Sequence, residues 1–259
     1  MSFVEEIFGL KGKVAAVIGG GGVLAGAMAT GLAKAGADVA ILDINPDNAR
    51  TRAKELESYG IRSLALQVDA TSKKQIQSAN HEILKRLGRV DIVINAPGIN
   101  SGTPFLEITE EEWMRILDVN LKSIFLSCQV FIKTMVDQGE GGSIINISSA
   151  SSGPPLSKVF TYSVTKAGIN NLTQNLAREY AKQNVRVNAI APGFFPAEQN
   201  RKLLTKERVA DIFRHTPMAR FGEAEELVGA AVWLASEKAS SFVTGAIIRV
   251  DGGFTAMTI

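Results

Sequence analysis

Short hydrophobic runs alternate with longer amphipathic stretches along this chain of 259 residues. Several of the runs are rich in Val and Ile and apolar throughout, as expected of strands buried on both faces of a sheet. The predicted strands are Val14–Ile18, Asp38–Leu42, Ser63–Gln67, Asp91–Asn95, Ser143–Ile147, Arg186–Ile190 and Ala246–Val250. Helical patterns fall between them at about 24–35, 46–59, 72–87, 110–136, 161–182 and 223–235.

This alternation of strands and helices predicts the fold class. Right-handed crossovers join parallel strands and leave helices on both faces. We therefore expect one α/β domain over residues 1–259, a Rossmann-type doubly wound fold with a seven-stranded parallel sheet flanked by helices. The segment 194–222 breaks the alternation and contains Pro196 and Pro217. Ligands bind beyond the carboxyl ends of such strands, so we expect this insertion to act as a substrate lid.

Composition narrows the possible functions. The chain is 46% hydrophobic and 21% charged, as in globular proteins, and no segment of about 18 uninterrupted apolar residues predicts a membrane-spanning helix. A net charge of +2 predicts neither a nucleic-acid partner nor a membrane surface. One cysteine, Cys128, leaves no internal disulfide, and His81 and His215 lack the spacing of metal ligands. The N-terminus has no secretory pattern, so we expect a cytoplasmic protein without a metal.

A glycine-rich turn, Gly19–Gly22, follows the first strand and is followed by Val23–Gly26 and a helix. Glycines allow the backbone to approach a phosphate closely, and a helix N-terminus offers free N–H groups to it. About 20 residues on, Asp43 ends the second strand, where a carboxylate can bind both adenosine ribose hydroxyls and would repel a 2′-phosphate. This pattern favours NAD over NADP. Taken alone, the glycines also fit a flexible turn and Asp43 a helix cap.

Tyr162 and Lys166 are four residues apart in a helical pattern, so they share one face. A nearby ammonium stabilises a phenolate and lowers the tyrosine pKa from about 10. The pair can therefore exchange protons with a substrate, although such a pair alone is usually incidental. Ser148 and Ser149 follow the strand Ser143–Ile147, where a hydroxyl can bind a substrate carbonyl.

From about residue 10 onward, the chain resembles the short-chain dehydrogenase/reductase family. The motifs that carry the resemblance are the glycine turn, Asp43, Asp69, Asn95–Gly98, Val119–Asn120, Ile147–Ser149, Tyr162–Lys166, Pro192–Gly193 and Val250–Gly253. The resemblance implies an enzyme that transfers hydride between a carbonyl and an alcohol with NAD(P). Within the family, Gly19–Gly26, Pro192–Arg201 and His215–Gly222 are most similar to a sugar-acid branch that acts on D-mannonate and D-fructuronate.

The resemblance also implies a role for each matching residue. Tyr162 is the acid/base, Ser149 orients the substrate oxygen, Lys166 binds the nicotinamide ribose and lowers the Tyr162 pKa, and Asn120 holds a water for a proton relay. The implied cofactor-binding residues are Gly19, Gly21, Gly22, Val23, Leu24, Asp43, Ile44, Asp69, Ala70, Asn95, Ala96, Pro97, Gly98, Tyr162, Lys166, Pro192, Gly193 and Phe195.

Several positions depart from the family pattern. Ile18 stands where a Thr is usual, and Val23 and Ala25 occupy the places of the second and third glycines. Pro97 removes one N–H donor. Ala197 replaces a Thr that often binds the nicotinamide carboxamide.

A sugar acid needs a cation for its carboxylate and polar groups for its hydroxyls. The candidates are Lys158, Arg201 and Lys202, with Asn100, Ser151 and Asn200 as neutral partners, although each also fits a solvated loop residue. One alternative is a reductase of another keto polyol, gluconate or a 3-oxoacyl thioester. The basic stretch Arg50–Lys54 is too weak to predict an acyl-carrier-protein partner. Another alternative is a non-catalytic nucleotide-binding protein on the same scaffold.

The helices predicted at 110–136 and 161–182 carry more apolar residues than one sheet face needs, although ordinary core packing accounts for most of them. In the family that the chain resembles, these helices pair across a two-fold axis and the segment Gly245–Gly253 makes a second contact. The resemblance therefore implies a homotetramer.

Overall fold

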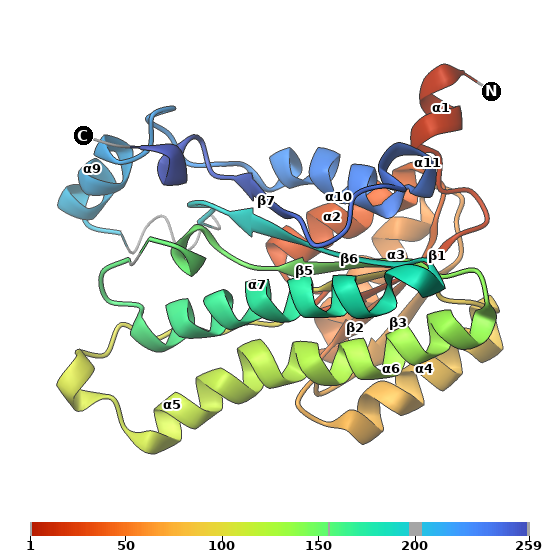
Figure 1. The fold of residues 1–259 in the computed structure, drawn as a ribbon, viewed down its shortest axis with the longest axis horizontal. Helices are drawn as coiled ribbons and strands as arrows, with labels where there is room; N and C mark the ends of the chain where they lie inside the picture. The colour runs from red at the N-terminus through yellow and green to blue at the C-terminus, as the bar shows by residue number, and fades with distance from the viewer. Residues whose placement is uncertain (1, 155, 197–203, 258–259) are drawn as a thin grey trace.

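The computed structural model describes residues 2–154, 156–196 and 204–257. Its sheet has seven parallel strands in the order β3-β2-β1-β4-β5-β6-β7 (Figure 1). The strands are β1 (Val14–Ile18), β2 (Asp38–Asp43), β3 (Ser63–Gln67), β4 (Ile92–Asn95), β5 (Gly142–Ile147), β6 (Val185–Pro192) and β7 (Ile247–Val250). The predicted fold class is confirmed.

Helices cover both faces of the sheet (Figure 1). On one face lie α2 (Val23–Lys34), α3 (Pro46–Glu57) and α10 (Val228–Ala235), and on the other lie α4 (Lys73–Leu87), α6 (Ser123–Gln138) and α7 (Phe160–Tyr180). Side chains of β1 alternate between the two layers: Ala15 and Val17 join the core under α2, whereas Ala16 and Ile18 join the core under α6. Hence both faces of this strand are apolar, as the sequence predicts.

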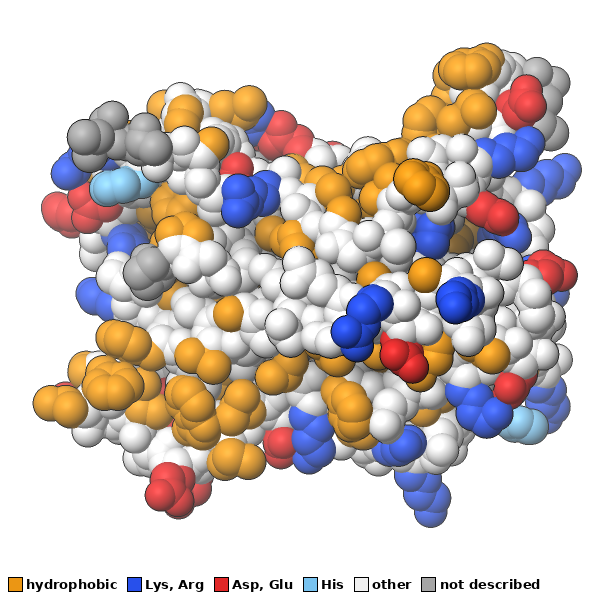
Figure 2. All heavy atoms as spheres, in the orientation of Figure 1, with side chains coloured by type: hydrophobic (Ala, Val, Ile, Leu, Met, Phe, Trp, Pro, Cys, Tyr) orange, Lys and Arg blue, Asp and Glu red, His pale blue; other side chains and the backbone are white. Residues whose placement is uncertain are grey.

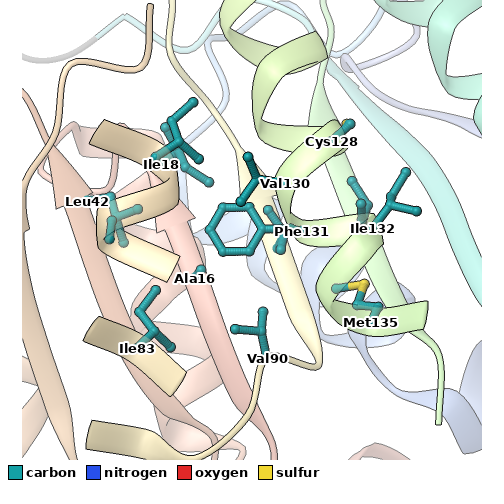
Figure 3. Packing of buried hydrophobic residues seen from close by; sticks show 14 of the residues in the cluster. Ala16, Ile18, Leu42, Ile83, Val90, Cys128, Val130, Phe131, Ile132 and Met135 are labelled. Carbon is teal, nitrogen blue, oxygen red and sulfur yellow. The ribbon is translucent and has the colours of Figure 1, made fainter. Parts of the chain in front are cut away.

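The core under α6 is centred on Phe131, whose side chain is fully buried. Figure 3 shows its ring projecting from the helix toward Ala16 of β1. Small residues on the sheet leave room for this large ring, and the packing fixes the distance between helix and sheet. This layer packs α6 and α7 against the sheet.

Most of the predicted helices are confirmed, but the 110–136 pattern is divided into α5 (Glu110–Leu117), a π-helical segment η2 (Asp118–Lys122) and α6. Such segments often mark functional sites because the extra residue redirects a side chain. By length and composition alone, the run Glu110–Gln138 could cross a membrane, but 56% of its most apolar window is buried inside the protein. It packs as a core helix.

Among the described residues, the short helices that were not predicted from the sequence are α1 (Phe3–Phe8), α9 (Lys206–Arg214) and α11 (Glu237–Ser240). The helix α9 lies within the 194–222 insertion and is capped by Thr205, whose hydroxyl accepts a hydrogen bond from the Arg208 N–H. The described ends of the insertion are tied together, because the Gly222 N–H donates to the Phe194 carbonyl at 2.9 Å. The insertion therefore leaves and rejoins the domain at one place.

Candidate active site

A cleft of about 590 Å³ opens at the carboxyl ends of the strands, next to the point between β1 and β4 where the strand order reverses. This is where open α/β sheets bind ligands, and the volume suits a small-molecule site. The sequence-predicted residues that line it are Gly19, Gly22, Val23, Leu24, Ala96, Pro97, Gly98, Asn100, Ser149, Tyr162, Lys166, Gly193 and Phe195. Segments as far apart in the sequence as Gly19 and Phe195 thus meet at one site.

Ser149 follows β5 and is held by its neighbour Ser151. Both the backbone N–H and the hydroxyl of Ser151 donate to Ser149 Oγ, each at 3.1 Å. A serine hydroxyl has two acceptor lone pairs and one proton to donate. With two donors already directed at its oxygen, Ser149 is left to donate its own proton to an acceptor in the cleft. Ser151 is 2% exposed and does not line the cleft.

Tyr162 and Lys166 lie on the same face of α7, as predicted. Lys166 Nζ lies 5.3 Å from the centre of the Tyr162 ring and donates to the Ile147 carbonyl at 2.7 Å. Burial lowers the pKa of Lys166 to about 8. Burial also raises the pKa of Tyr162, while a hydrogen bond with Ser149 lowers it in part. The expected lowering of the Tyr162 pKa by Lys166 stays a prediction, because the shift found here comes from desolvation of the phenol and from the hydrogen bond with Ser149.

Asn120 lies in η2, is fully buried, and makes its hydrogen bonds within the protein. Its Oδ1 accepts from the Ile99 N–H at 2.8 Å and its Nδ2 donates to the Ile99 carbonyl at 2.9 Å. Nδ2 also lies 3.2 Å from the hydroxyl of Thr165, which donates in turn to the Tyr162 carbonyl. Through Asn120, the π-helical segment thus links the loop that follows β4 to the turn of α7 that contains Tyr162.

The glycine turn forms a cradle at the start of α2. Gly19 has φ +75°, and a Cβ added there would lie 3.0 Å from the Ala96 carbonyl oxygen. A Cβ on Gly21 would lie 2.7 Å from Asn48 Cβ. Gly22 is the N-cap of α2 and makes no side-chain cap, so the first N–H groups of the helix are open to an anion. The turn therefore tolerates only glycine at its tightest points.

Asp43 anchors this turn from the end of β2. One carboxylate oxygen accepts from the Gly21 N–H at 2.9 Å and the other accepts from the Asn45 N–H at 2.9 Å. Ile44 follows and is 68% exposed. Gly26, one turn into α2, lies against the Arg52 guanidinium of α3, which a Cβ would approach to 2.6 Å. The glycines that are displaced from the family pattern thus have two uses. Gly21 lets the turn lie close to Asp43 and Asn48, and Gly26 lets α2 pack against Arg52 of α3.

Some predicted cofactor residues lie outside the cleft lining. Asn95 is fully buried, and its side chain bonds to Asn146 and Ser127 beneath the site, so it supports the strand ends from below. Asp69 accepts from the N–H and hydroxyl of Thr71 and shapes the loop after β3. The others outside the lining are Gly21, Asp43, Ile44, Ala70 and Pro192.

Among the substrate candidates, Asn100 lines the cleft, whereas Lys158 is exposed at φ +64° and does not. Ala197, Asn200, Arg201 and Lys202 lie outside the described residues. The sequence analysis missed Arg208 and Ile212 of α9, which line the cleft. The spacing of Val209, Ile212 and Phe213 after Thr205 is the helical signal that could have found them. Among the described residues, no group of three or more His, Cys, Asp or Glu could hold a metal ion.

Comparison with known proteins identifies the family. A family model described as Enoyl-(Acyl carrier protein) reductase matches residues 22–255. The 5-keto-D-gluconate 5-reductase of Escherichia coli K12 is 36% identical over 251 residues, covering 96% of this chain and 98% of the relative.

Two solved structures are similar over nearly their full length. A gluconate 5-dehydrogenase from Burkholderia cenocepacia, in complex with NADP and tartrate, is 32% identical with a TM-score of 0.93, covering 98% of this chain and 100% of the other. A protein from Haemophilus influenzae with bound NAD, provisionally described as a D-mannonate oxidoreductase, is 34% identical with a TM-score of 0.92, covering 99% of each. The chain therefore belongs to the short-chain dehydrogenase/reductase family and is an oxidoreductase that acts on CH–OH groups.

Proposed function

We propose that this enzyme interconverts a keto sugar acid and its secondary alcohol with NAD(H), and that the substrate is of the gluconate type. The observation that carries the proposal is one cleft in which Ser149, Tyr162 and Lys166 face the glycine turn at the start of α2. Proton transfer and dinucleotide binding thereby share a single site. The non-catalytic alternative would not need the proton-transferring residues to line this cleft.

The residues present fit a nicotinamide dinucleotide. Gly19 and Gly21 lie where a Cβ would strike neighbouring atoms, and Gly22 leaves the α2 N-terminus uncapped, as a bound pyrophosphate requires. Asp43 offers a carboxylate for the adenosine ribose, and exposed Ile44 offers no cation for a 2′-phosphate. We therefore favour NAD over NADP. When bound, the nicotinamide supplies or accepts the hydride.

The chain's own residues manage the proton. Ser149 donates a hydrogen bond to the substrate oxygen and keeps its own proton, since Ser151 occupies its acceptor sites. In reduction, Tyr162 gives its phenolic proton to that oxygen, breaking its own O–H bond as the alcohol O–H forms. The raised pKa of Tyr162 keeps the phenol protonated at neutral pH, which suits reduction. Lys166 stabilises the phenolate left behind, and Asn120 fixes the adjacent loop.

The gluconate type is favoured over mannonate and fructuronate, the substrates that the sequence motifs suggested. The E. coli relative is a 5-keto-D-gluconate 5-reductase, and a second E. coli relative, 37% identical, is a 2-dehydro-3-deoxy-D-gluconate 5-dehydrogenase. The Haemophilus protein with bound NAD supports D-mannonate as the second candidate. Both candidates are sugar acids with a secondary alcohol, so one assay separates them.

A substrate panel tests this proposal. NADH oxidation is measured with 5-keto-D-gluconate, D-fructuronate, a neutral keto polyol and a 3-oxoacyl thioester. We expect kcat/KM for 5-keto-D-gluconate to exceed that for the neutral ketone and the thioester by at least about 10-fold. A sugar acid that is turned over no better than the neutral ketone would contradict the substrate class. NADH binding without turnover of any compound would favour the non-catalytic alternative.

We also propose that the enzyme is a homotetramer. Figure 2 shows hydrophobic side chains gathered over the end of the molecule that carries η1 (Phe105–Glu107), α5 and the start of α7. Leu106 is 93% exposed, and Phe105 packs on Phe160 with ring centres 5.2 Å apart while both rings remain exposed. A monomer rarely leaves such a patch uncovered. A monomer in light scattering at micromolar concentration would refute the assembly.

Two further expectations remain proposals. The insertion 194–222 is a lid, supported by α9 lining the cleft and by the bond between Gly222 and Phe194 at its base. The protein is cytoplasmic, supported by a single cysteine, Cys128, which leaves the chain without an internal disulfide. Protease protection of the insertion by NADH plus substrate tests the first, and cell fractionation tests the second.

A further inference from the structure

The helix α9 carries a cation to the mouth of the cleft. Arg208 and Ile212 lie one turn apart on this helix and both line the cleft. Among the described residues that line the cleft, the charged ones are Lys166 and Arg208, and none is an Asp or Glu. The charge of the described lining is therefore positive, which favours an anionic ligand.

The two cations are not equivalent. Lys166 is 3% exposed and its ammonium donates to the Ile147 carbonyl beneath Tyr162. It is committed to the reacting end of the site. Arg208 is partly exposed, so its guanidinium is accessible to a ligand that enters the cleft. A substrate charge remote from its reacting carbon would meet Arg208 rather than Lys166.

Within the described part of the chain, the Arg208 guanidinium has a hydroxyl partner rather than a carboxylate. Its Nη1 donates to the Ser157 hydroxyl at 3.0 Å, and no ion pair to Arg208 is found among the described residues. Asp211 lies one turn away on α9 but pairs with Arg214 at 2.7 Å. A guanidinium has five N–H donors in a planar fork, so a single bond to a neutral hydroxyl leaves donors for a carboxylate.

From this geometry we infer that Arg208 binds the carboxylate of the sugar-acid substrate. The inference rests on the proposed function, and it adds a residue on a regular helix to the loop cations suggested by the sequence. The hydrogen bond from Arg208 to Ser157 joins α9 to the loop that follows β5. Leu156, next to Ser157 in this loop, also lines the cleft. Substrate binding at Arg208 would therefore bridge the insertion and the catalytic loop.

The test compares a substrate with its neutral form. Wild type, Arg208→Gln and Arg208→Lys are assayed in the oxidation direction. The substrates are the alcohol that corresponds to the best keto sugar acid of the panel and the primary amide of that alcohol. For the gluconate type, these are D-gluconate and D-gluconamide. Arg214→Gln is the matched control, because Arg214 lies on the same helix, is already paired, and does not line the cleft. NADH affinity is measured by fluorescence in every variant to verify folding and cofactor binding.

We expect wild type to prefer the acid over the amide by about 10- to 100-fold in kcat/KM, mainly through KM, as loss of a charge-assisted hydrogen bond implies. Arg208→Gln should abolish this preference, Arg208→Lys should keep part of it, and Arg214→Gln should keep all of it, with NADH affinity unchanged. An active wild type whose preference survives in Arg208→Gln would overturn the inference alone. A wild type inactive on every sugar acid would overturn the proposed function as well.

Discussion

Lys166 Nζ and the Ile147 carbonyl oxygen lie 2.7 Å apart in the interior of the protein, where Lys166 is 3% exposed. The carbonyl ends β5, and the same amine lies 5.3 Å from the centre of the Tyr162 ring. One hydrogen bond to the sheet thus fixes the position of a cation next to the Tyr162 phenol. The pKa of this lysine, lowered to about 8 by burial, measures the energetic cost of that placement.

Replacing Lys166 by Met is expected to stabilise the protein while abolishing activity. The folded pKa of about 8 lies below the unfolded value of 10.5, so the unfolded chain binds more protons between these values and wild-type stability rises with pH there. Below pH 8 the full cost of burying the ammonium is present. The variant also leaves the Ile147 carbonyl without its donor, which offsets part of the gain. We therefore expect the free energy of unfolding to rise by about 1 kcal/mol net at pH 7.

Urea unfolding of the cofactor-free proteins at pH 7 and pH 10 measures this difference. The stability advantage of Lys166→Met over wild type should shrink, or reverse, at pH 10. A difference that does not change with pH would show that the Lys166 ammonium is not destabilised in the folded protein.

The pH dependence of turnover follows from Tyr162. Burial raises the pKa of its phenol, so the phenol is protonated at neutral pH and ready to donate in reduction. Oxidation requires the phenolate, and its rate should therefore climb as pH rises into the alkaline range, whereas reduction should fall there. Steady-state rates in both directions between pH 6 and pH 10 check this. An oxidation rate that is already level below pH 7 would mean that the holoenzyme lowers this pKa.

Ser151 acts through Ser149. Its hydroxyl and N–H both donate to Ser149 Oγ, and it does not line the cleft. We expect Ser151→Ala to lower kcat about 3- to 10-fold with little change in NADH affinity, because Ser149 loses one of the two donors that orient it. Ser152→Ala is the control, since the Ser152 hydroxyl bonds to the Ser149 carbonyl rather than to its hydroxyl. If Ser151→Ala and Ser152→Ala lowered kcat equally, Ser151 would not be the residue that orients the Ser149 hydroxyl.

Asp43 and Ile44 are expected to set the choice of cofactor. The Asp43 carboxylate stands at the glycine turn, and Ile44 beside it is exposed. Wild type should use NADH over NADPH by about 100-fold or more, because the carboxylate repels a 2′-phosphate. The double variant Asp43→Ser, Ile44→Arg should reverse the preference by removing the charge and adding a cation. Dissociation constants for both cofactors decide this, and equal affinities in wild type would contradict it.

The strands and the helix α7 could be predicted because their signals are local. Runs of Val and Ile mark β1 and its neighbours, and the four-residue spacing places Tyr162 and Lys166 on one face of α7. The pKa of Tyr162 could not be predicted, since it depends on burial by distant segments. Arg208 was missed because only the tertiary position of α9 brings it to the cleft.

The most direct test of the account is NADH oxidation with 5-keto-D-gluconate by wild type and Tyr162→Phe, alongside the NADH dissociation constant of each. Phe keeps the ring and removes only the proton donor. The account predicts that Tyr162→Phe lowers kcat by about 10²- to 10⁴-fold while NADH affinity is retained. A variant that keeps wild-type turnover with the same substrate would contradict the assignment of Tyr162 as the acid/base.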